Sequence, residues 1–396
     1  MRRVRPHSSA FPEPRRSPRR RRRPHGQGLI EYAIVLSVIA LVVFGVLQFL
    51  GGQVKSSLCS VTVGLAGQSS SDSMVLTPAL ADGAGPLQMV LGPDNNLWFT
   101  EEGQSKIGTV NLTTKALTEF ATTGTTTGIV VGPDNRLWFT EPNANKVGAV
   151  TTAGVVSEWS FANPMGIAVG PDSNIWFTEQ SANNIVAVNT SGVSVHAYGI
   201  PTGGTLPASI ITGSDNNLWF TEWGVAALGK LTTGGSFTQV ANGQIHNSVT
   251  LVSGPKGEVW VSEEPSSLVF AGGSTNSGSG GPAQVARVDP TTGNVIEQIN
   301  IDPNFSIPVV TVMDSGNNVW VANAWKQGSG TGLPDFEQIS PNGQLCETPA
   351  NSTPGAPVWI AKGPGTTLYF TAQAAVYAAG TFPAGGTTGA KIAQLQ

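Results

Sequence analysis

The chain has 396 residues, of which 49 are Gly, 27 are Pro and only 12% are charged. This composition suits many short strands joined by tight turns better than a helical protein, which would be richer in Glu, Lys and Ala. The formal net charge of −4 hides an asymmetry. Residues 1–25 hold ten Arg and one Glu, whereas the rest carries 11 basic and 24 acidic residues. The acidic remainder argues against binding to nucleic acid or other acidic polymers.

The N-terminal segment combines a basic leader with an apolar stretch. Residues 1–26 contain the unbroken run Arg19–Arg23 and are predicted to be disordered. An arginine run can bind nucleic acid, but here 18 uncharged residues follow from Ala33 to Leu50, enough for a slightly short membrane span. Arginine-rich flanks stay in the cytoplasm. We therefore expect a single-pass membrane protein whose residues after Leu50 lie outside the membrane.

The junction between leader and apolar stretch reads GQGLIEY from Gly26 to Tyr32. It resembles the processing site of Flp-type type IV pilins, in which a prepilin peptidase cuts after the glycine. The resemblance implies a mature chain that starts at Gln27, with Glu31 and Tyr32 at its fifth and sixth positions, and a pilin-like transmembrane helix over residues 27–52. It also implies the prepilin peptidase and other pilin subunits as partners. The alternative is an uncleaved anchor with Glu31 among the lipid headgroups.

A Ser- and Gly-rich linker over residues 53–72 leads into a repeat that is built around one aromatic residue. The repeated motif is close to GPDNNLWFTE. Its copies are Gly92–Glu101, Gly132–Glu141, Gly170–Glu179, Gly213–Glu222, Gly254–Glu263, and the degenerate Asp314–Asn323 and Gly363–Ala372. Successive aromatic positions, from Trp98 to Tyr369, are 40, 38, 43, 41, 60 and 49 residues apart. A period near 40 predicts an all-β, seven-bladed β-propeller over residues 73–396.

Within a repeat, four strands are expected. In the second repeat they are Gly128–Val131, LWFT at residues 137–140, Lys146–Val150 and Val155–Trp159. The tryptophan is expected between blades, where burial of each ring stabilises the fold by roughly 2–3 kcal/mol. The longest interval contains residues 271–281, AGGSTNSGSGG, which read as a flexible surface insertion.

The two ends of the repeat region are expected to meet. Lys391–Gln396 matches the third strand of the other repeats and leaves the last blade without its outer strand. Met74–Leu80 resembles the outer strands, so we expect it to complete that blade and close the ring. Closure removes two open sheet edges, which otherwise invite aggregation.

The repeated GPDxxLWFTE, followed by K-[IV]-G, is similar to the repeat of the virginiamycin B lyase family over residues 74–396. The resemblance implies a seven-bladed propeller that uses Mg²⁺ and a channel-facing His with a Glu. That family opens streptogramin-like cyclic depsipeptides by carbon–oxygen elimination. A fold does not carry its function with it, so the activity has to be judged residue by residue.

In that family the active His opens the first strand, fourteen positions before the Glu that ends WFTE. The corresponding residues here are Leu87, Thr127, Met165, Ala208, Val249, Val309 and Val358, and none is His. A general base at neutral pH is most often His. His246, three residues before Val249, is the candidate that remains, with Glu263 as its partner. His196 lies in an outer strand and is interpreted as an ordinary surface residue.

The acidic end of the motif is kept in five successive repeats, as Glu101, Glu141, Glu179, Glu222 and Glu263, with Asn323 and Ala372 in the last two. If these carboxylates approach one end of the channel, they would recruit a hard divalent cation such as Mg²⁺ or Ca²⁺. In the alternative interpretation each Glu accepts hydrogen bonds from the backbone of a neighbouring blade and belongs to the fold.

Three functions are compatible with these features. The leading hypothesis is a binding, adhesion or display module on the cell surface or a pilus, with an unknown extracellular ligand at the propeller channel. A Mg²⁺-dependent lyase is the second, and a purely structural minor pilin is the third. Cys59 and Cys346 would only tether linker to propeller if they pair, which an oxidising compartment permits.

Overall fold

The computed structural model describes residues 85–241, 243–254, 256–263, 283–302, 306–326, 335–343, 345–348, 356–364, 367–373 and 391–395. All of them belong to the second of two compact units, Ser60–Gln396. Apart from the short 3-10 turn η1 (Pro142–Ala144), every regular element in these ranges is a strand, and none is a helix able to cross a membrane. The leader, the predicted helix 27–52, the linker and the processing residues Gly26, Gln27, Glu31 and Tyr32 lie outside the described residues.

The described strands form six four-stranded antiparallel sheets and one three-stranded sheet. In chain order the first three sheets are β1 (Pro86–Leu91), β2 (Leu97–Glu101), β3 (Lys106–Val110), β4 (Leu117–Ala121); β5 (Ile129–Val131), β6 (Leu137–Glu141), β7 (Lys146–Val150), β8 (Val156–Ser160); β9 (Pro164–Val169), β10 (Ile175–Glu179), β11 (Asn184–Val188), β12 (Ser194–Gly199). The next three are β13 (Pro207–Thr212), β14 (Leu218–Glu222), β15 (Ala227–Leu231), β16 (Phe237–Val240); β17 (Ser248–Ser253), β18 (Val259–Glu263), β19 (Ala283–Val288), β20 (Val295–Asp302); β21 (Ser306–Met313), β22 (Val319–Lys326), β23 (Asp335–Ile339), β24 (Leu345–Thr348). The seventh sheet is β25 (Ala356–Lys362), β26 (Leu368–Gln373), β27 (Lys391–Leu395).

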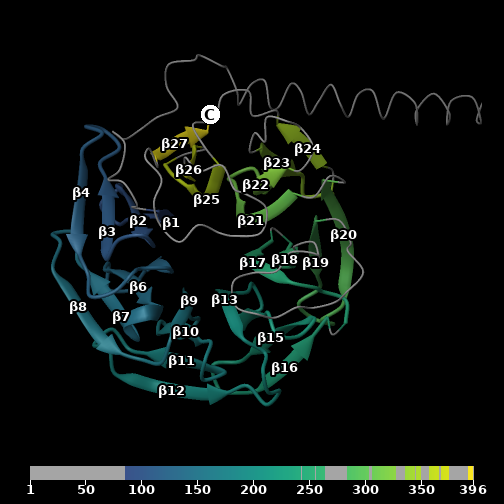
Figure 1. Cartoon of the computed structure of the whole chain (residues 1–396). Coiled ribbons are helices and arrows are strands. Elements are labelled where there is room, and N and C mark those ends of the chain that lie inside the picture. Colours follow the sequence, from purple (N-terminus) through teal and green to yellow (C-terminus); the bar gives the residue numbers. More distant parts are fainter. Residues whose placement is uncertain are drawn as a thin grey trace, which may run out of the picture. The chain divides into compact units, whose positions relative to one another are not determined.

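The sheets are arranged around a common centre, with the first strand of each sheet innermost and the fourth at the rim (Figure 1). The first strands of neighbouring sheets contact one another in the sequence β1, β5, β9, β13, β17, β21, β25 and back to β1. The predicted all-β propeller is therefore confirmed. Lys391–Leu395 is the third strand of the last sheet, as expected. Met74–Leu80, the predicted closing strand, and the insertion 271–281 lie outside the described residues.

The repeated tryptophan lies between sheets, as the sequence predicted. Trp98, Trp138, Trp176, Trp219 and Trp260 are fully buried. Trp98 packs in one cluster with Leu137 and Phe139 of the following sheet. In most repeats the indole N–H donates to the aspartate of the preceding turn, for example from Trp138 Nε1 to Asp134 Oδ1 at 3.1 Å. The turn is completed by Asn135, whose φ of 59° explains the preference for Asn at this position.

The preference for glycine in the K-[IV]-G segment is also explained by a contact within the repeat. Gly148 on β7 faces Phe139 on β6, and a Cβ atom added at Gly148 would overlap the phenylalanine ring. The same close approach occurs between Gly108 and Phe99. The small residue on the third strand and the large ring on the second are thus one packing unit that recurs from sheet to sheet.

The threonine of WFTE joins neighbouring sheets. Its hydroxyl donates to a carbonyl of the next sheet's innermost segment in three successive cases: Thr100 to Thr127 at 3.0 Å, Thr140 to Met165 at 2.7 Å, and Thr178 to Ala208 at 2.8 Å. Every residue type in the repeated motif except the final glutamate therefore has a role in turn formation or sheet packing. Only that glutamate needs a separate account.

Candidate functional site

The five motif glutamates end the second strand of their sheets and are at most 7% exposed. The second strand lies one position outward from the innermost strand, so these residues do not form the channel wall. From the sequence, all five carboxylates were expected to approach one end of the channel. The hydrogen bonds that these carboxylates accept come instead from connections between sheets and from outer strands.

Three of the carboxylates hold the connection that arrives from the preceding sheet. The acceptor is a glutamate oxygen and the donor is the backbone N–H seventeen residues earlier. The bonds are Gly124 N to Glu141 Oε1 at 2.6 Å, Ala162 N to Glu179 Oε1 at 2.8 Å, and His246 N to Glu263 Oε2 at 2.8 Å. For these residues the structure agrees with the interpretation that the glutamate belongs to the fold.

Two of the five motif carboxylates accept a hydrogen bond from the outer strand of their own sheet. Gln239 on β16 donates to Glu222 Oε2 at 2.6 Å, and Gln298 on β20 donates to Glu263 Oε1 at 3.4 Å. In the first two sheets the outer-strand residue is acidic and ion-paired. These pairs are Lys106 with Glu119 at 2.7 Å and Lys146 with Glu158 at 2.8 Å. Sequence analysis missed these partners, although in three sheets they follow the motif glutamate by 17 or 18 residues.

Burial changes the acidity of several of these groups. It raises the pKa of Glu101 to about 8, and the negative charge of Glu119 adds to the effect while Lys106 opposes it. Burial also raises the pKa of Glu141 and of Glu263 to about 7, and the backbone hydrogen bonds from Gly124 and His246 act in the opposite direction. The pKa of Glu222 is raised for the same reason. At neutral pH these carboxyl groups therefore bind protons more readily than ordinary surface glutamates.

The divalent ion that the sequence suggested stays a prediction. Some buried carboxylate oxygens do lack a hydrogen-bond partner, namely both oxygens of Glu101, Oε2 of Glu141 and Oε1 of Glu222. However, no group of three His, Cys, Asp or Glu side chains within the described ranges is placed to hold a metal ion. Mg²⁺ and Ca²⁺ favour several oxygen ligands at once. Asn323 and Ala372 occupy the equivalent positions in β22 and β26.

His246 and Glu263 are in contact, but the contact does not involve the imidazole ring that acid–base chemistry would use. The contact is made by the backbone N–H of His246, and its side chain is exposed. Val249, fourteen positions before Glu263, lies in β17. His196 lies in β12 as predicted, where its ring lies beside Trp176 and Tyr198 with centroid separations of 6.0 and 5.5 Å, and those two rings are 6.2 Å from each other. Neither described histidine is hydrogen-bonded through its imidazole to a motif glutamate.

Residues 66–270, just over half of the chain, match the sequence model of the virginiamycin B lyase family. The chain belongs to this family. Among solved structures it is similar to a streptogramin B lyase, with 22% identity, a TM-score of 0.64 and coverage of 80% of this chain and 95% of that one. No curated protein matches the chain.

Two further structures place the family in context. A virginiamycin B lyase from Staphylococcus aureus is 24% identical, with a TM-score of 0.62 and coverage of 74% of this chain and 93% of that one. The extracellular domain of a two-component system protein from B. thetaiotaomicron is 12% identical, with a TM-score of 0.57 and coverage of 82% of this chain and 42% of that one. At these identities the likeness establishes the propeller fold, which the lyase shares with a protein of another class.

The raised pKa of Glu141 leads to a test by pH. The pKa of Glu141 is 4.5 in the unfolded chain and about 7 in the folded protein. Between pH 4.5 and about pH 7 the folded state therefore binds more protons than the unfolded state. As the pH rises through this range, Glu141 lowers the free energy of unfolding. Glu141→Gln keeps an acceptor for Gly124 N and removes the ionisation. We expect the free energy of unfolding of the variant, relative to that of wild type, to be about 1–2 kcal/mol higher at pH 8 than at pH 4.5.

Urea denaturation of both proteins at the two pH values measures the difference. A stability difference that stays the same at pH 4.5 and pH 8 would show that the Glu141 carboxyl group has no raised pKa.

Proposed function

We propose that the chain is an extracytoplasmic binding or adhesion module, displayed at the cell surface or in a pilus by its N-terminal segment. The observation that carries the proposal is the hydrogen bonding of the motif glutamate at the end of β18. Glu263 is bound by the backbone N–H of His246 and by Gln298, and the residue fourteen positions before it is Val249, not a histidine. In the proposal, the propeller is retained and this glutamate serves structural hydrogen bonds in place of acid–base chemistry.

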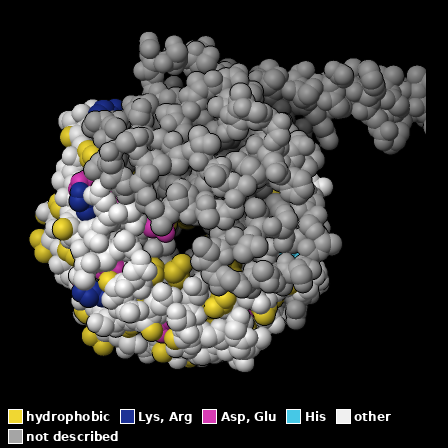
Figure 2. All heavy atoms as spheres, viewed as in Figure 1, with side chains coloured by type: hydrophobic (Ala, Val, Ile, Leu, Met, Phe, Trp, Pro, Cys, Tyr) yellow, Lys and Arg dark blue, Asp and Glu magenta, His cyan; other side chains and the backbone are white. Residues whose placement is uncertain are grey.

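The ligand of such a module is expected at the ring itself. Figure 2 shows a hollow near the centre of the ring, bordered on its described side by acidic and hydrophobic side chains. Propellers commonly place ligand contacts on the loops of one face, because the blades beneath form a rigid support. The ring is proposed to have seven complete blades, with Met74–Leu80 as the outer strand beside β27. Protection of the Met74–Leu80 amides from hydrogen exchange would support this closure, and free exchange would contradict it.

The anchor rests on sequence features that precede the described residues. The 18-residue apolar stretch and the GQGLIEY junction support a processed, pilin-like helix. In cells that express a prepilin peptidase, the mature N-terminus is expected to be Gln27, as measured by intact mass. Gly26→Leu is the matched control and should leave the full-length chain. An uncut wild-type chain, or a cut at another bond, would contradict the processing proposal.

The position of the propeller can be tested separately from processing. An amine-reactive label that does not cross membranes should modify propeller lysines such as Lys106 in intact cells, because the arginine-rich leader is expected to remain in the cytoplasm. A cytoplasmic protein serves as the internal control for cell integrity. Labelling of the propeller only after cell lysis would contradict an extracytoplasmic location.

Carbon–oxygen lyase activity remains the second candidate, because the chain belongs to the family and a catalytically inactive variant of the S. aureus enzyme has been solved with quinupristin at 24% identity and a TM-score of 0.61. In this candidate His246 would act as the base and Glu263 as its partner, with Mg²⁺ as the cofactor. The backbone contact between the two residues favours the binding role over this one.

A further inference from the structure

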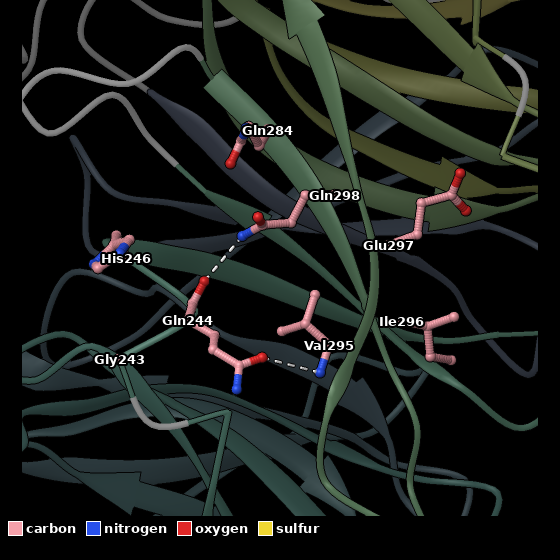
Figure 3. Close-up of a pocket in the computed structure, with 8 residues that line it drawn as sticks. All are labelled: Gly243, Gln244, His246, Gln284, Val295, Ile296, Glu297 and Gln298. Atoms are coloured by element: carbon pink, nitrogen blue, oxygen red, sulfur yellow. Dashed lines mark hydrogen bonds between the residues drawn. The ribbon is translucent and has the colours of Figure 1, made fainter.

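The fifth sheet carries a groove on its outer side that no part of the sequence analysis anticipated. The groove has a volume of about 500 Å³ and is lined by the connection that enters the sheet and by its two outer strands. Figure 3 shows its lining residues, Gly243, Gln244, His246, Gln284, Val295, Ile296, Glu297 and Gln298. Its size lies within the range typical of small-ligand sites.

The groove coincides with a change at two fixed positions of the repeat. The first position lies on the third strand, opposite the motif glutamate. The second lies on the outer strand, opposite the third-strand residue that follows the first position by two. In the first sheet these positions hold Lys106 and Glu119, which form an ion pair. The second sheet repeats the arrangement with Lys146 and Glu158.

In the fifth sheet the same two positions hold Gln284 and Gln298. They do not bond to each other. Gln284 donates to Asn300 at 2.7 Å, and Gln298 donates to the carbonyl of Gln244 at 2.9 Å, as Figure 3 shows for the latter. An ion pair that closes the surface in two other sheets is thus replaced by two separated carboxamides with a groove beside them.

The lining offers uncharged donors and acceptors from three carboxamides. Within the described ranges, Gln244 uses its oxygen to accept the N–H of Val295 at 3.4 Å, and its amide nitrogen has no acceptor. In the same ranges, the side-chain oxygens of Gln284 and Gln298 have no hydrogen-bond partner. The carboxylate of Glu297 is paired with Arg287 at 2.8 Å, and Arg287 also contacts Glu258 at 3.3 Å. Hydroxyl groups, which donate and accept, are the natural partners of carboxamides.

An apolar wall completes the lining. Val295 and Ile296 lie on one side of the groove, and Ile296 is 54% exposed. Ile296 is the extra residue of a β-bulge, because Arg287 pairs with Glu297 and Val288 pairs with Val295. A second irregularity follows where Gln284 pairs with Asn300 and Ala283 with Asp302. Bulges interrupt the edge of β20 and disfavour the addition of an extended peptide as a further strand.

We propose that this groove binds a neutral saccharide, with the carboxamides of Gln244, Gln284 and Gln298 bonded to sugar hydroxyls and Ile296 against the C–H face of a ring. The inference rests on the proposed binding role and names its ligand class. Neutral sugars combine many donor–acceptor groups with apolar C–H surface, and the lining supplies both kinds of contact.

The test uses the full chain in an amine-oxide detergent, since sugar-based detergents would compete. Maltose, cellobiose and N,N′-diacetylchitobiose are titrated calorimetrically, and a panel of unrelated peptides is titrated in parallel. The decisive variant is Gln284→Lys with Gln298→Glu, which rebuilds the ion pair of the first two sheets. The matched control is Lys106→Gln with Glu119→Gln, which removes that pair from the first sheet. Ile296→Asp is a second variant at an exposed position that does not depend on the rebuilt pair.

At least one disaccharide is expected to bind wild type and the matched control equally. Its affinity for the rebuilt variant and for Ile296→Asp is expected to be at least tenfold weaker, with unchanged thermal midpoints. Binding of no disaccharide, or equal binding to all variants, would overturn the saccharide proposal. Binding of a peptide that both groove variants weaken, without binding of a disaccharide, would also overturn it while leaving the binding role intact.

Discussion

Replacement of Trp138 by Ala is expected to lower the free energy of unfolding by about 3–5 kcal/mol, the usual cost of removing a fully buried tryptophan. Its ring lies between two sheets, in one cluster with Ile167 and Phe177. It also stacks on Trp159 with a centroid separation of 5.1 Å, and its N–H donates to Asp134. The substitution therefore leaves a cavity and removes one of the hydrogen bonds to Asp134 at the same place.

Chemical denaturation of the full chain, followed by tryptophan fluorescence and circular dichroism, measures this loss. Val155→Ala is a control next to the same sheet, just before β8, because Val155 is 63% exposed and its truncation should change stability by less than about 0.5 kcal/mol. A loss below about 1 kcal/mol for Trp138→Ala would show that the repeated aromatic residue does not hold neighbouring sheets together.

The second large effect is expected at Gly148, where the smallest possible enlargement should destabilise the protein. Gly148→Ala places a methyl group into the ring of Phe139, which is itself fully buried and unable to move away. Overpacking of this kind costs about 1–3 kcal/mol. The same denaturation measurement applies.

Two variants make the Gly148 result specific. Gly199→Ala is the matched control, since the nearest atom to its added methyl group is Asn184 Oδ1 at an ordinary 3.6 Å. Phe139→Leu combined with Gly148→Ala should recover part of the loss, because the two residues are in direct contact. Equal stability of Gly148→Ala and wild type would contradict the packing account of the K-[IV]-G segment.

Much of the fold was predictable because each repeat carries its own local causes. The positive φ of Asn135 requires a residue such as Asn, Trp138 needs the aspartate of the turn, and Gly148 needs to be small beside Phe139. These constraints act within about fifteen residues and recur near every fortieth, so they are visible in the chain as a motif. The strands predicted for the second repeat agree with β5 to β8 within a residue at most ends.

The surroundings of Glu141 and Glu263 were harder to predict, because they depend on contacts with strands and connections outside the repeated motif. Sequence periodicity places a glutamate at the end of the second strand but does not say whether its carboxylate meets the channel or the outer strand. The structure gives the second outcome for Glu263, through Gln298 thirty-five residues later. The variable insertion between these residues conceals the spacing that is visible in the other sheets.

The groove of the fifth sheet was invisible for a related reason. Gln284 and Gln298 are ordinary polar residues in a sequence. Only the strand register shows that they occupy the positions of Lys106 and Glu119 in the first sheet. The N-terminal residues Gly26, Gln27, Glu31 and Tyr32 are the opposite case. Their pattern is explicit in the sequence and stays a prediction, because they precede the described part of the chain.

Family membership and family chemistry are separable here because the matching motif is structural. Its proline, asparagine, tryptophan, threonine and glycine form turns and hold sheets together, whichever reaction the ring supports. The position fourteen residues before the motif glutamate is independent of those constraints, and in the fifth sheet Val249 occupies it. A binding role is therefore compatible with membership of the virginiamycin B lyase family.

The most direct test of this account is the turnover of quinupristin by the purified full chain with Mg²⁺, followed by mass spectrometry of the opened ring. An authentic virginiamycin B lyase serves as the positive control, and buffer with Mg²⁺ as the blank. We predict no ring-opened product above the blank. Ring opening that depends on both Mg²⁺ and the protein would contradict the account and make the chain a lyase.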